Sequence, residues 1–216
     1  MKLLNSDKTC PNEYYVYTNM ALESFRSNLN IVRSISSIAW RQCMSDEGFK
    51  RKYLENKCSY LPYIANPEDS LNTSSPFVFS EITGFRIEHD AECYRAEHYP
   101  GYPSRLSAIH AHDNLEDAVR LGERNGWPLS MIKKFRLKED ELTRVIRANI
   151  EIPQFAKMVY RVPVPGKEAK NCLWEDYWTG EGAVSMELNL ESLKTEKFHS
   201  GLTWHFLIEG KLLLVE

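Results

Sequence analysis

The sequence lacks the signals that mark several common classes of protein. Apolar runs all fall well short of the roughly 20 residues that a membrane-spanning helix needs, and the start, Met1 to Lys8, has no apolar segment typical of a signal peptide. Neither sign of charge dominates, since 27 basic and 30 acidic residues leave a net charge of −3. We therefore expect a cytoplasmic protein without a membrane partner. A dedicated nucleic-acid binder would usually be basic, so only a local basic groove fits this charge.

Cysteine and histidine patterns of metal sites and disulfide frameworks are also missing. The five cysteines are odd in number, widely spaced and form no CxxC pair: Cys10, Cys43, Cys58, Cys93 and Cys172. We interpret them as free thiols in a reducing cytosol. His110 and His112 would share one face of a strand, but no third ligand accompanies them, so we predict no metal site.

Four catalytic or nucleotide-binding motifs are absent from the chain: GxGxxG, GxxxxGK[ST], GxSxG and HExxH. Each motif supplies a specific turn, phosphate cradle, nucleophile or metal ligand pair. Their absence disfavours Rossmann oxidoreductases, P-loop NTPases, α/β-hydrolases and zincins.

What is present predicts a helical N-terminal part. With 216 residues, 43% of them hydrophobic, the chain suits one domain or one domain with a helical extension. Apolar residues recur every three or four positions from Leu22 to Ile38, which is typical of an amphipathic helix. A cap at residues 45–47 predicts a second helix over about 48–57. We assign residues 1–62 to this part and the turn-rich residues 63–76 to a loop.

Residues 77–216 are rich in short strands. We expect strands at about 77–79, 85–87, 105–111, 130–137, 142–152 and 184–190, and a closing hairpin formed by 202–208 and 211–215. Asp113 or Asn114 caps a helix that ends at Gly126, and a helix or turn follows over about 167–177. Many short strands with few intervening helices predict an α+β fold with a mixed, largely antiparallel sheet.

Three segments contain residue types that carry chemistry. In Tyr99–His112, a rigid approach places Ser104, Arg105 and Ser107 at a strand entrance, where hydroxyls beside a guanidinium can hold a phosphate or a ribose. The alternative is a loop cap with Arg105 in a surface ion pair. In Phe85–Tyr99, we expect salt bridges of Arg86 with Glu88 and of Arg95 with Glu97 on a solvated strand face.

The third segment, Trp174–Gly182, combines aromatic rings with carboxylates. Gly180 and Gly182 flank Glu181, so the backbone can present this carboxylate on an exposed turn, where it can stabilise a developing cation or accept a proton. The rings of Tyr177 and Trp178 suit stacking on a flat ligand. The alternative is that they anchor the segment to the core.

Four stretches of the sequence carry a family resemblance. These are Tyr102–His112, then Asn114–Ala118 opening a helix, then Tyr177–Glu181 with the pattern Tyr-Trp-x-Gly, and the closing stretch Thr203–Leu212. Together they resemble uncharacterised bacterial and phage proteins of the ADP-ribosyltransferase-like superfamily, over roughly residues 77–216. The resemblance implies a split β-fold that holds NAD in a cleft.

The resemblance also implies roles for individual residues. Glu181, with Glu187 as its rival, would be the late catalytic carboxylate, and Arg86 would be the first-strand catalytic group. Cofactor contacts would come from Ser104, Arg105, Ser107, Tyr177 and Trp178. The chain departs from the family pattern in lacking an E-x-E pair near Glu181 and a first-strand histidine. If Tyr15–Thr18 is the first strand, it displaces Arg86 from its role.

We therefore expect an NAD-dependent transferase of the glycosyltransferase class that modifies a protein or a nucleic acid. Such an enzyme would be a toxin, an effector delivered into a host cytosol or a phage-defence component. The alternative is a non-catalytic interaction, immunity or anti-defence protein on the same fold, whose N-terminal helices bind an antitoxin or another partner protein. A nuclease or a nucleic-acid binder is a third hypothesis, which the net charge of −3 disfavours. The enzyme hypothesis requires Tyr99–His112 and Trp174–Gly182 to face each other.

Overall fold

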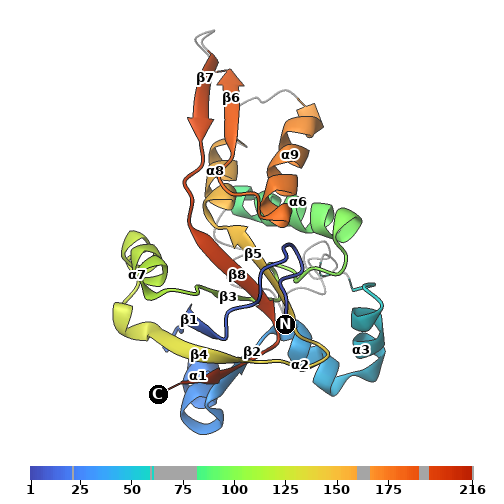
Figure 1. The fold of residues 1–216 in the computed structure, drawn as a ribbon, viewed down its shortest axis with the longest axis vertical. Coiled ribbons are helices and arrows are strands. Elements are labelled where there is room, and N and C mark those ends of the chain that lie inside the picture. Colours follow the sequence, from blue (N-terminus) through green and yellow to red (C-terminus); the bar gives the residue numbers. More distant parts are fainter. Residues whose placement is uncertain (21, 59, 61–81, 160–165, 190–194, 216) are drawn as a thin grey trace.

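The computed structural model describes residues 1–20, 22–58, 60, 82–159, 166–189 and 195–215. They form an α+β fold with three antiparallel sheets, as the sequence predicts (Figure 1). The residues expected to form the loop 63–76 and the strand 77–79 lie outside this description.

A four-stranded sheet combines strands from both ends of the chain. Its order is β1 (Glu13–Tyr17), β4 (Ile132–Lys138), β9 (Lys211–Leu214) and β2 (Ser34–Ser36). Alternate residues point to opposite faces of a strand, and the inner face is fully buried at Tyr14, Phe135 and Leu212. Residues 1–62 therefore contribute two strands to the core as well as helices.

A three-stranded sheet packs against this inner face. Its order is β3 (Ile109–Ala111), β8 (Trp204–Glu209) and β5 (Arg144–Asn149). Val145, Phe206 and Ile208 belong to the same hydrophobic cluster as the inner residues of the first sheet. The two sheets meet where Tyr15 and His112 exchange backbone hydrogen bonds of 2.7 and 2.9 Å. These two sheets are thus joined at one corner.

Three helices cover the other face of the three-stranded sheet: α6 (Ile82–His98), α8 (Glu151–Val159) and α9 (Gly166–Thr179). Ile146 and Leu207, which are cross-strand partners, pack in one cluster with Ile87 of α6 and Trp178 of α9. The hairpin of β6 (Ser185–Asn189) and β7 (Thr195–His199) projects beyond these helices (Figure 1).

The remaining helices are short and lie around the four-stranded sheet. They are α1 (Glu23–Ser27), the π-helical η1 (Asn28–Val32), α2 (Ile38–Ser45), α3 (Glu47–Leu54), α7 (Leu115–Arg124) and the 3₁₀ turn η2 (Leu129–Met131). Asp46 caps α3 and Asn114 caps α7, each accepting backbone N–H groups as expected from the sequence. In the described ranges, every helix is too short or too polar to cross a bilayer.

The structure corrects three predictions. The stripe from Leu22 to Ile38 is not one helix, because Arg33 takes a left-handed conformation (φ 52°) and Ile35 pairs with Leu212 in the sheet. Residues 85–87 are not a strand but part of α6. The expected strand at 105–111 begins only at Ile109, because residues 104–108 form a turn closed by the bond from the Ala108 N–H to the Ser104 carbonyl.

The prediction of a closing hairpin is also wrong, although both of its strands exist. β8 pairs with β3 and β5, whereas β9 pairs with β4 and β2, so the chain crosses from one sheet to the other at Gly210. The Gly210 backbone is held there by two bonds with Ser37, one from the Gly210 N–H to the Ser37 hydroxyl and one from the Ser37 N–H to the Gly210 carbonyl. This contact replaces the ladder that a hairpin would form.

The fully buried Asn149 at the end of β5 holds the loops on either side of the β6–β7 hairpin. Its amide donates to the carbonyls of Gly182 and Gly201 (3.0 and 2.8 Å) and accepts the N–H groups of Glu151 and Thr203 (both 3.1 Å). We expect Asn149→Ala to lower the free energy of unfolding by about 3 kcal/mol, because buried partners lose their bonds. Urea unfolding measures this, and Asn125→Ala, an exposed helix end, should cost less than about 1 kcal/mol. An equal decrease in the free energy of unfolding of the two variants would contradict this role of Asn149.

Candidate functional site

The segments Tyr99–His112 and Trp174–Gly182 are in direct contact. The Arg105 guanidinium donates through Nη1 to the Tyr177 hydroxyl at 2.5 Å. A second contact lies nearby, where the Glu175 carboxylate accepts hydrogen bonds from the hydroxyls of Tyr94 and Tyr99 (2.5 and 2.6 Å). The turn after α6 is therefore bound to α9 by charged and aromatic groups.

Arg105 is the centre of a cluster, here called the Arg105 cluster, that comprises Glu88, Arg105, His110, Tyr177 and His205. Glu88 of α6 accepts two parallel bonds from the guanidinium, at 2.8 Å from Nε and 2.7 Å from Nη2. Burial raises the pKa of Glu88, but the Arg105 cation outweighs it and holds the pKa below its usual range. This pair is more than a surface salt bridge, because the Arg105 side chain is only 10% exposed.

A chain of polar contacts links Arg105, Tyr177 and His205. A guanidinium only donates, so the Tyr177 hydroxyl accepts from Arg105. The same hydroxyl lies 3.0 Å from His205 Nε2. The other ring nitrogen, Nδ1, is buried and has no partner among the described residues. Burial, followed by the charges of His110 and Arg105, lowers the pKa of His205 well below its usual value.

His110 lies at the exposed side of the cluster. Its ring centroid is 5.3 Å from that of His205, and its Nε2 is 3.4 Å from the Arg105 carbonyl. The side chains of the cluster come from α6, α9, β3 and β8 and from the turn that precedes β3. This cluster is where the fold brings ionisable groups from distant parts of the chain together next to solvent.

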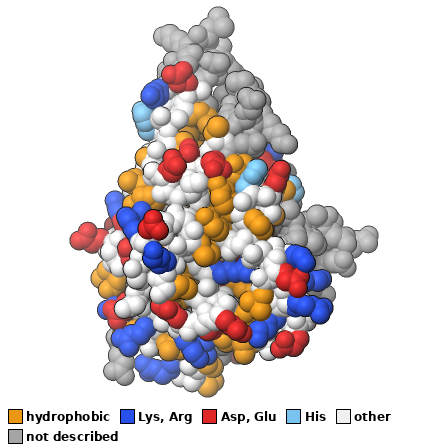
Figure 2. Space-filling model, turned by 45° about the vertical axis from the view of Figure 1, so that its right-hand side comes forward, with side chains coloured by type: hydrophobic (Ala, Val, Ile, Leu, Met, Phe, Trp, Pro, Cys, Tyr) orange, Lys and Arg blue, Asp and Glu red, His pale blue; other side chains and the backbone are white. Residues whose placement is uncertain are grey.

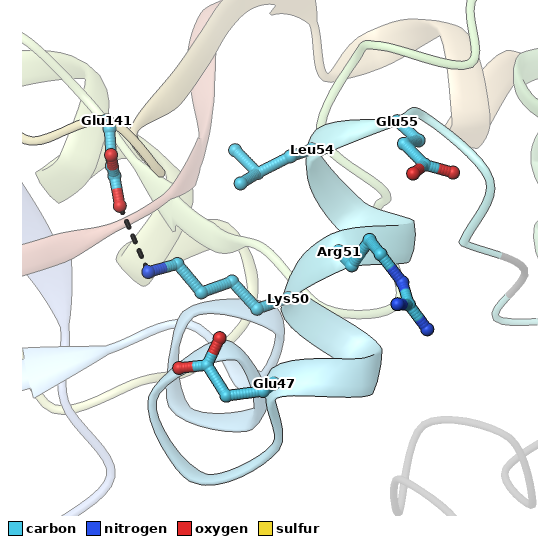
Figure 3. Close-up of a pocket in the computed structure, with 6 residues that line it drawn as sticks. All are labelled: Glu47, Lys50, Arg51, Leu54, Glu55 and Glu141. Atoms are coloured by element: carbon cyan, nitrogen blue, oxygen red, sulfur yellow. Dashed lines mark ion pairs between the residues drawn. The ribbon is translucent and has the colours of Figure 1, made fainter.

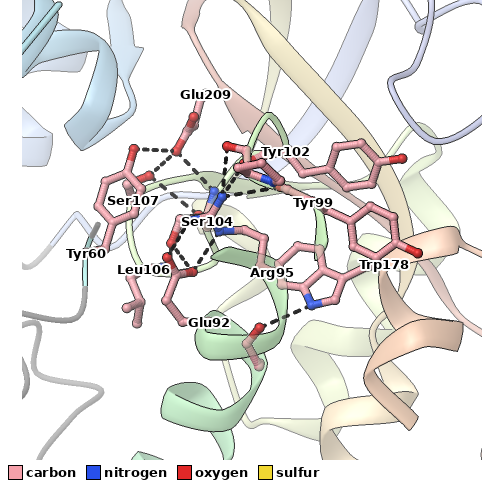
Figure 4. A network of polar contacts seen from close by, with 12 residues as sticks. Tyr60, Glu92, Arg95, Tyr99, Tyr102, Ser104, Leu106, Ser107, Trp178 and Glu209 are labelled. Carbon is pink, nitrogen blue, oxygen red and sulfur yellow. Dashed lines mark hydrogen bonds and ion pairs between the residues drawn. The ribbon is translucent and has the colours of Figure 1, made fainter. Parts of the chain in front are cut away.

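The two serines predicted to bind a cofactor face inward (Figure 4). Ser104 is fully buried, its hydroxyl donates to Glu92 at 2.8 Å, and its N–H donates to Glu209 at 3.1 Å. The Ser107 hydroxyl, also buried, donates to the same Glu209 oxygen, which accepts from Tyr60 as well. These hydroxyls fix the turn that carries Arg105.

The two aromatic residues predicted to contact the cofactor also lie in the interior. Tyr177 and Trp178 are fully buried, and the Trp178 indole donates to the Ala91 carbonyl of α6 at 3.2 Å. Trp178 therefore anchors α9 to α6, as the alternative interpretation of this segment proposed. Tyr177 combines this packing role with its bonds to Arg105 and His205.

The candidate catalytic carboxylates are exposed. Glu181 follows α9, between Gly180 and Gly182, whose φ values of 72° and 112° are in the region that favours glycine. Burial and then the charge of Glu181 raise the pKa of Asp176, so the two carboxylates lie near each other. Glu187, the rival, is exposed on β6.

Arg86 does not lie on a first strand, because it belongs to α6 and the first strand is β1. The expected strand-face pairs are wrong for the same reason. In a helix, residues two apart face different directions, so Glu88 pairs with Arg105 instead of Arg86. Arg95 likewise pairs with Glu92, one helical turn earlier, instead of Glu97.

A shallow, open hollow of about 400 Å³ lies beside α3, away from these residues (Figure 3). Its lining is of mixed charge: Glu47, Lys50, Arg51, Leu54, Glu55 and Glu141. Lys50 and Glu141 form an ion pair of 3.1 Å across it. None of the predicted site residues lines this hollow.

The comparisons add no family assignment. No protein-family model matches the sequence, and no curated protein matches it either. Within the ranges that the structure describes, no three His, Cys, Asp or Glu side chains are grouped so that they could hold a metal ion. The functional assignment therefore depends on the residues and their geometry.

The buried His205 predicts that folding is sensitive to acid. Its folded-state pKa is below the value of about 6.5 in an unfolded chain, so the unfolded state binds the proton first as the pH falls. We expect the free energy of unfolding to decrease below about pH 6.5, with His205 accounting for about 1 kcal/mol between pH 7.5 and 5.5. Urea unfolding at both values checks this.

In the same experiment, His205→Gln should lose this part of the pH dependence. His199→Gln is the matched control, because His199 is exposed on β7. The His199→Gln variant should show the same decrease in the free energy of unfolding between pH 7.5 and 5.5 as the wild-type protein. An unchanged pH dependence in His205→Gln would show that His205 takes up a proton equally in the folded and unfolded states, and would contradict the prediction.

Proposed function

We propose that this protein transfers ADP-ribose from NAD to a protein or nucleic-acid acceptor. The observation that carries the proposal is the hydrogen bond between Arg105 and Tyr177, which joins the two segments on which the family resemblance depends. It lies on the helix-covered side of a split pair of antiparallel sheets. The bond brings together two segments that lie about 70 residues apart in the sequence.

In this reaction the bond between the nicotinamide nitrogen and the ribose breaks, and nicotinamide leaves with the electron pair. Positive charge develops on the ribose, and an acceptor nucleophile adds to it and gives up a proton. Glu181 is the candidate for steadying that charge and taking the proton, because its carboxylate is exposed on a glycine-flanked turn.

Arg105 is the candidate for holding an oxygen of the cofactor. Its bonds to Glu88 and Tyr177 use three of the five N–H groups of a guanidinium, so two remain for a phosphate or ribose oxygen. Ser104, Ser107 and Trp178 then act indirectly, by fixing the turn and the helix that carry Arg105 and Tyr177.

The second candidate is a non-catalytic interaction or immunity protein on the same fold. The observation that favours it is the inward orientation of Ser104 and Ser107, whose hydroxyls are occupied by Glu92 and Glu209. Its partner would contact the helices α2 and α3. The first proposal implies a toxin, effector or phage-defence enzyme, and this one implies a protein that regulates such an enzyme.

Replacing the late carboxylate tests the enzymatic proposal. We expect Glu181→Gln to reduce nicotinamide release, and the transfer of labelled ADP-ribose to components of a cell lysate, by about 100-fold or more. Folding should be unaffected, because Glu181 is exposed. Glu187→Gln is the matched control and should keep wild-type activity.

Which variants lose transfer activity decides between the two candidate carboxylates, and the behaviour of the wild-type protein decides between the two candidate functions. Loss in Glu187→Gln alone would move the catalytic role to Glu187. If the wild-type protein neither releases nicotinamide nor is stabilised by NAD against thermal unfolding, with or without lysate, the non-catalytic candidate is favoured.

A further inference from the structure

The outer face of the four-stranded sheet carries a concentration of positive charge. Alternate residues of β4 point outward, namely Lys134, Arg136 and Lys138, while Phe135 and Leu137 between them are buried. Lys211 of β9 is the cross-strand partner of Lys138 and adds a fourth cation. In Figure 2 most of the Lys and Arg side chains in view lie in the lower half of the molecule, interspersed with Asp and Glu, and Figure 1 shows this sheet at that end.

Among the described residues of these strands, one carboxylate accompanies the four cations on the outer face. Glu13 of β1 pairs with Lys134 at 2.5 Å and with Arg136 at 3.4 Å, so the face has a net charge of +3 on a chain whose net charge is −3. The acidic residues at the end of β4 are engaged elsewhere. Glu139 pairs with the terminal amine of Met1, and Asp140 accepts the Trp40 indole N–H.

Lys138 and Lys211 place two positive charges opposite each other on neighbouring strands. They are Cα partners in the β4–β9 ladder, and like charges directly opposite each other destabilise a sheet. Among the described residues, neither ammonium group forms an ion pair, and Lys211 Nζ instead lies 5.6 Å from the centre of the Trp40 ring. A bound polyanion would relieve the repulsion between the two lysines.

Aromatic rings lie on the same face beside the cations. Tyr15 is the cross-strand partner of Lys134, and Tyr17 stacks on Trp127 with centroids 4.5 Å apart. Both tyrosines are half-buried, whereas Tyr14 and Val16, which alternate with them along β1, point into the core. Rings beside a row of cations are the combination that binds single strands, because bases stack on rings while phosphates pair with Lys and Arg.

We propose that the outer face of the four-stranded sheet binds single-stranded nucleic acid. Lys134, Arg136, Lys138 and Lys211 contact the phosphates, and Tyr15 stacks on a base. A broad sheet face suits a single strand better than a duplex, whose major groove admits a helix or a two-stranded ribbon. The surface is separate from the Arg105 cluster, so binding requires neither NAD nor transfer.

Fluorescence anisotropy with a labelled, mixed-sequence 20-nucleotide RNA or DNA tests the surface, with NAD absent. We expect binding at 50 mM salt and a slope of log affinity against log salt of about −3, since each neutralised phosphate of a single strand contributes about −0.7. Tyr15→Ala should weaken binding about tenfold, and Tyr15→Phe should retain it.

The substitution Lys138→Glu should weaken nucleic-acid binding without lowering the stability of the protein. The new carboxylate faces Lys211, so the melting temperature should not fall, while the affinity should fall about tenfold and the salt slope should become shallower by at least about 0.7. Lys52→Glu, an equal change of charge at an exposed position of α3, is the matched control and should bind as the wild-type protein does.

Three results would overturn the proposal. The first is the absence of measurable binding at 50 mM salt, and the second is an equal loss of affinity in Lys138→Glu and Lys52→Glu. The third is tighter binding to a duplex of the same sequence, or to phosphatidylserine vesicles, than to the single strand. None of these results bears on nicotinamide release, so the proposed transferase activity is tested separately.

Discussion

The buried ion pair between Arg95 and Glu92 is the interaction on which the arrangement of the Arg105 cluster depends. Both side chains are almost fully inaccessible, and two bonds of 3.0 and 2.7 Å join them within α6. The remaining guanidinium nitrogen donates to the carbonyls of Tyr99, Pro100 and Tyr102. Removing one charge would leave the other buried and unpaired, which typically costs about 3–5 kcal/mol. The pair therefore fixes the turn after α6.

That turn determines where Arg105 can lie. Glu92 also accepts the Ser104 hydroxyl, and Glu209 of β8 accepts the Ser104 N–H, so the residue before Arg105 is held from α6 and from the sheet at once. Arg105 then reaches Glu88, one turn earlier than Glu92 on the same helix. Glu92 thus holds the turn after α6, and Glu88 binds the Arg105 guanidinium. Arg105 in turn donates a hydrogen bond to Tyr177 of α9.

The two proposed functions use opposite ends of one compact arrangement. The Arg105 cluster lies where α6 and α9 cover the three-stranded sheet, whereas the basic outer face belongs to the four-stranded sheet. The sheets share a hydrophobic core and meet at Tyr15 and His112, so the proposed binding face and the proposed catalytic region are parts of one folded unit.

The sequence by itself determined the elements whose signals are local. Caps at Asp46 and Asn114, alternation in β4 and β6, and the strand-rich composition predicted an α+β fold with a mixed, largely antiparallel sheet, because each signal involves residues within one helical turn or one strand. Tertiary structure decided the rest. Ile35 joins a sheet because Leu212 lies beside it, and β8 and β9 separate because each finds partners in a different sheet. Glu88 of α6 pairs with Arg105, and Glu92 accepts the Ser104 hydroxyl, so two carboxylates of this helix are held by residues beyond it, which no local pattern records.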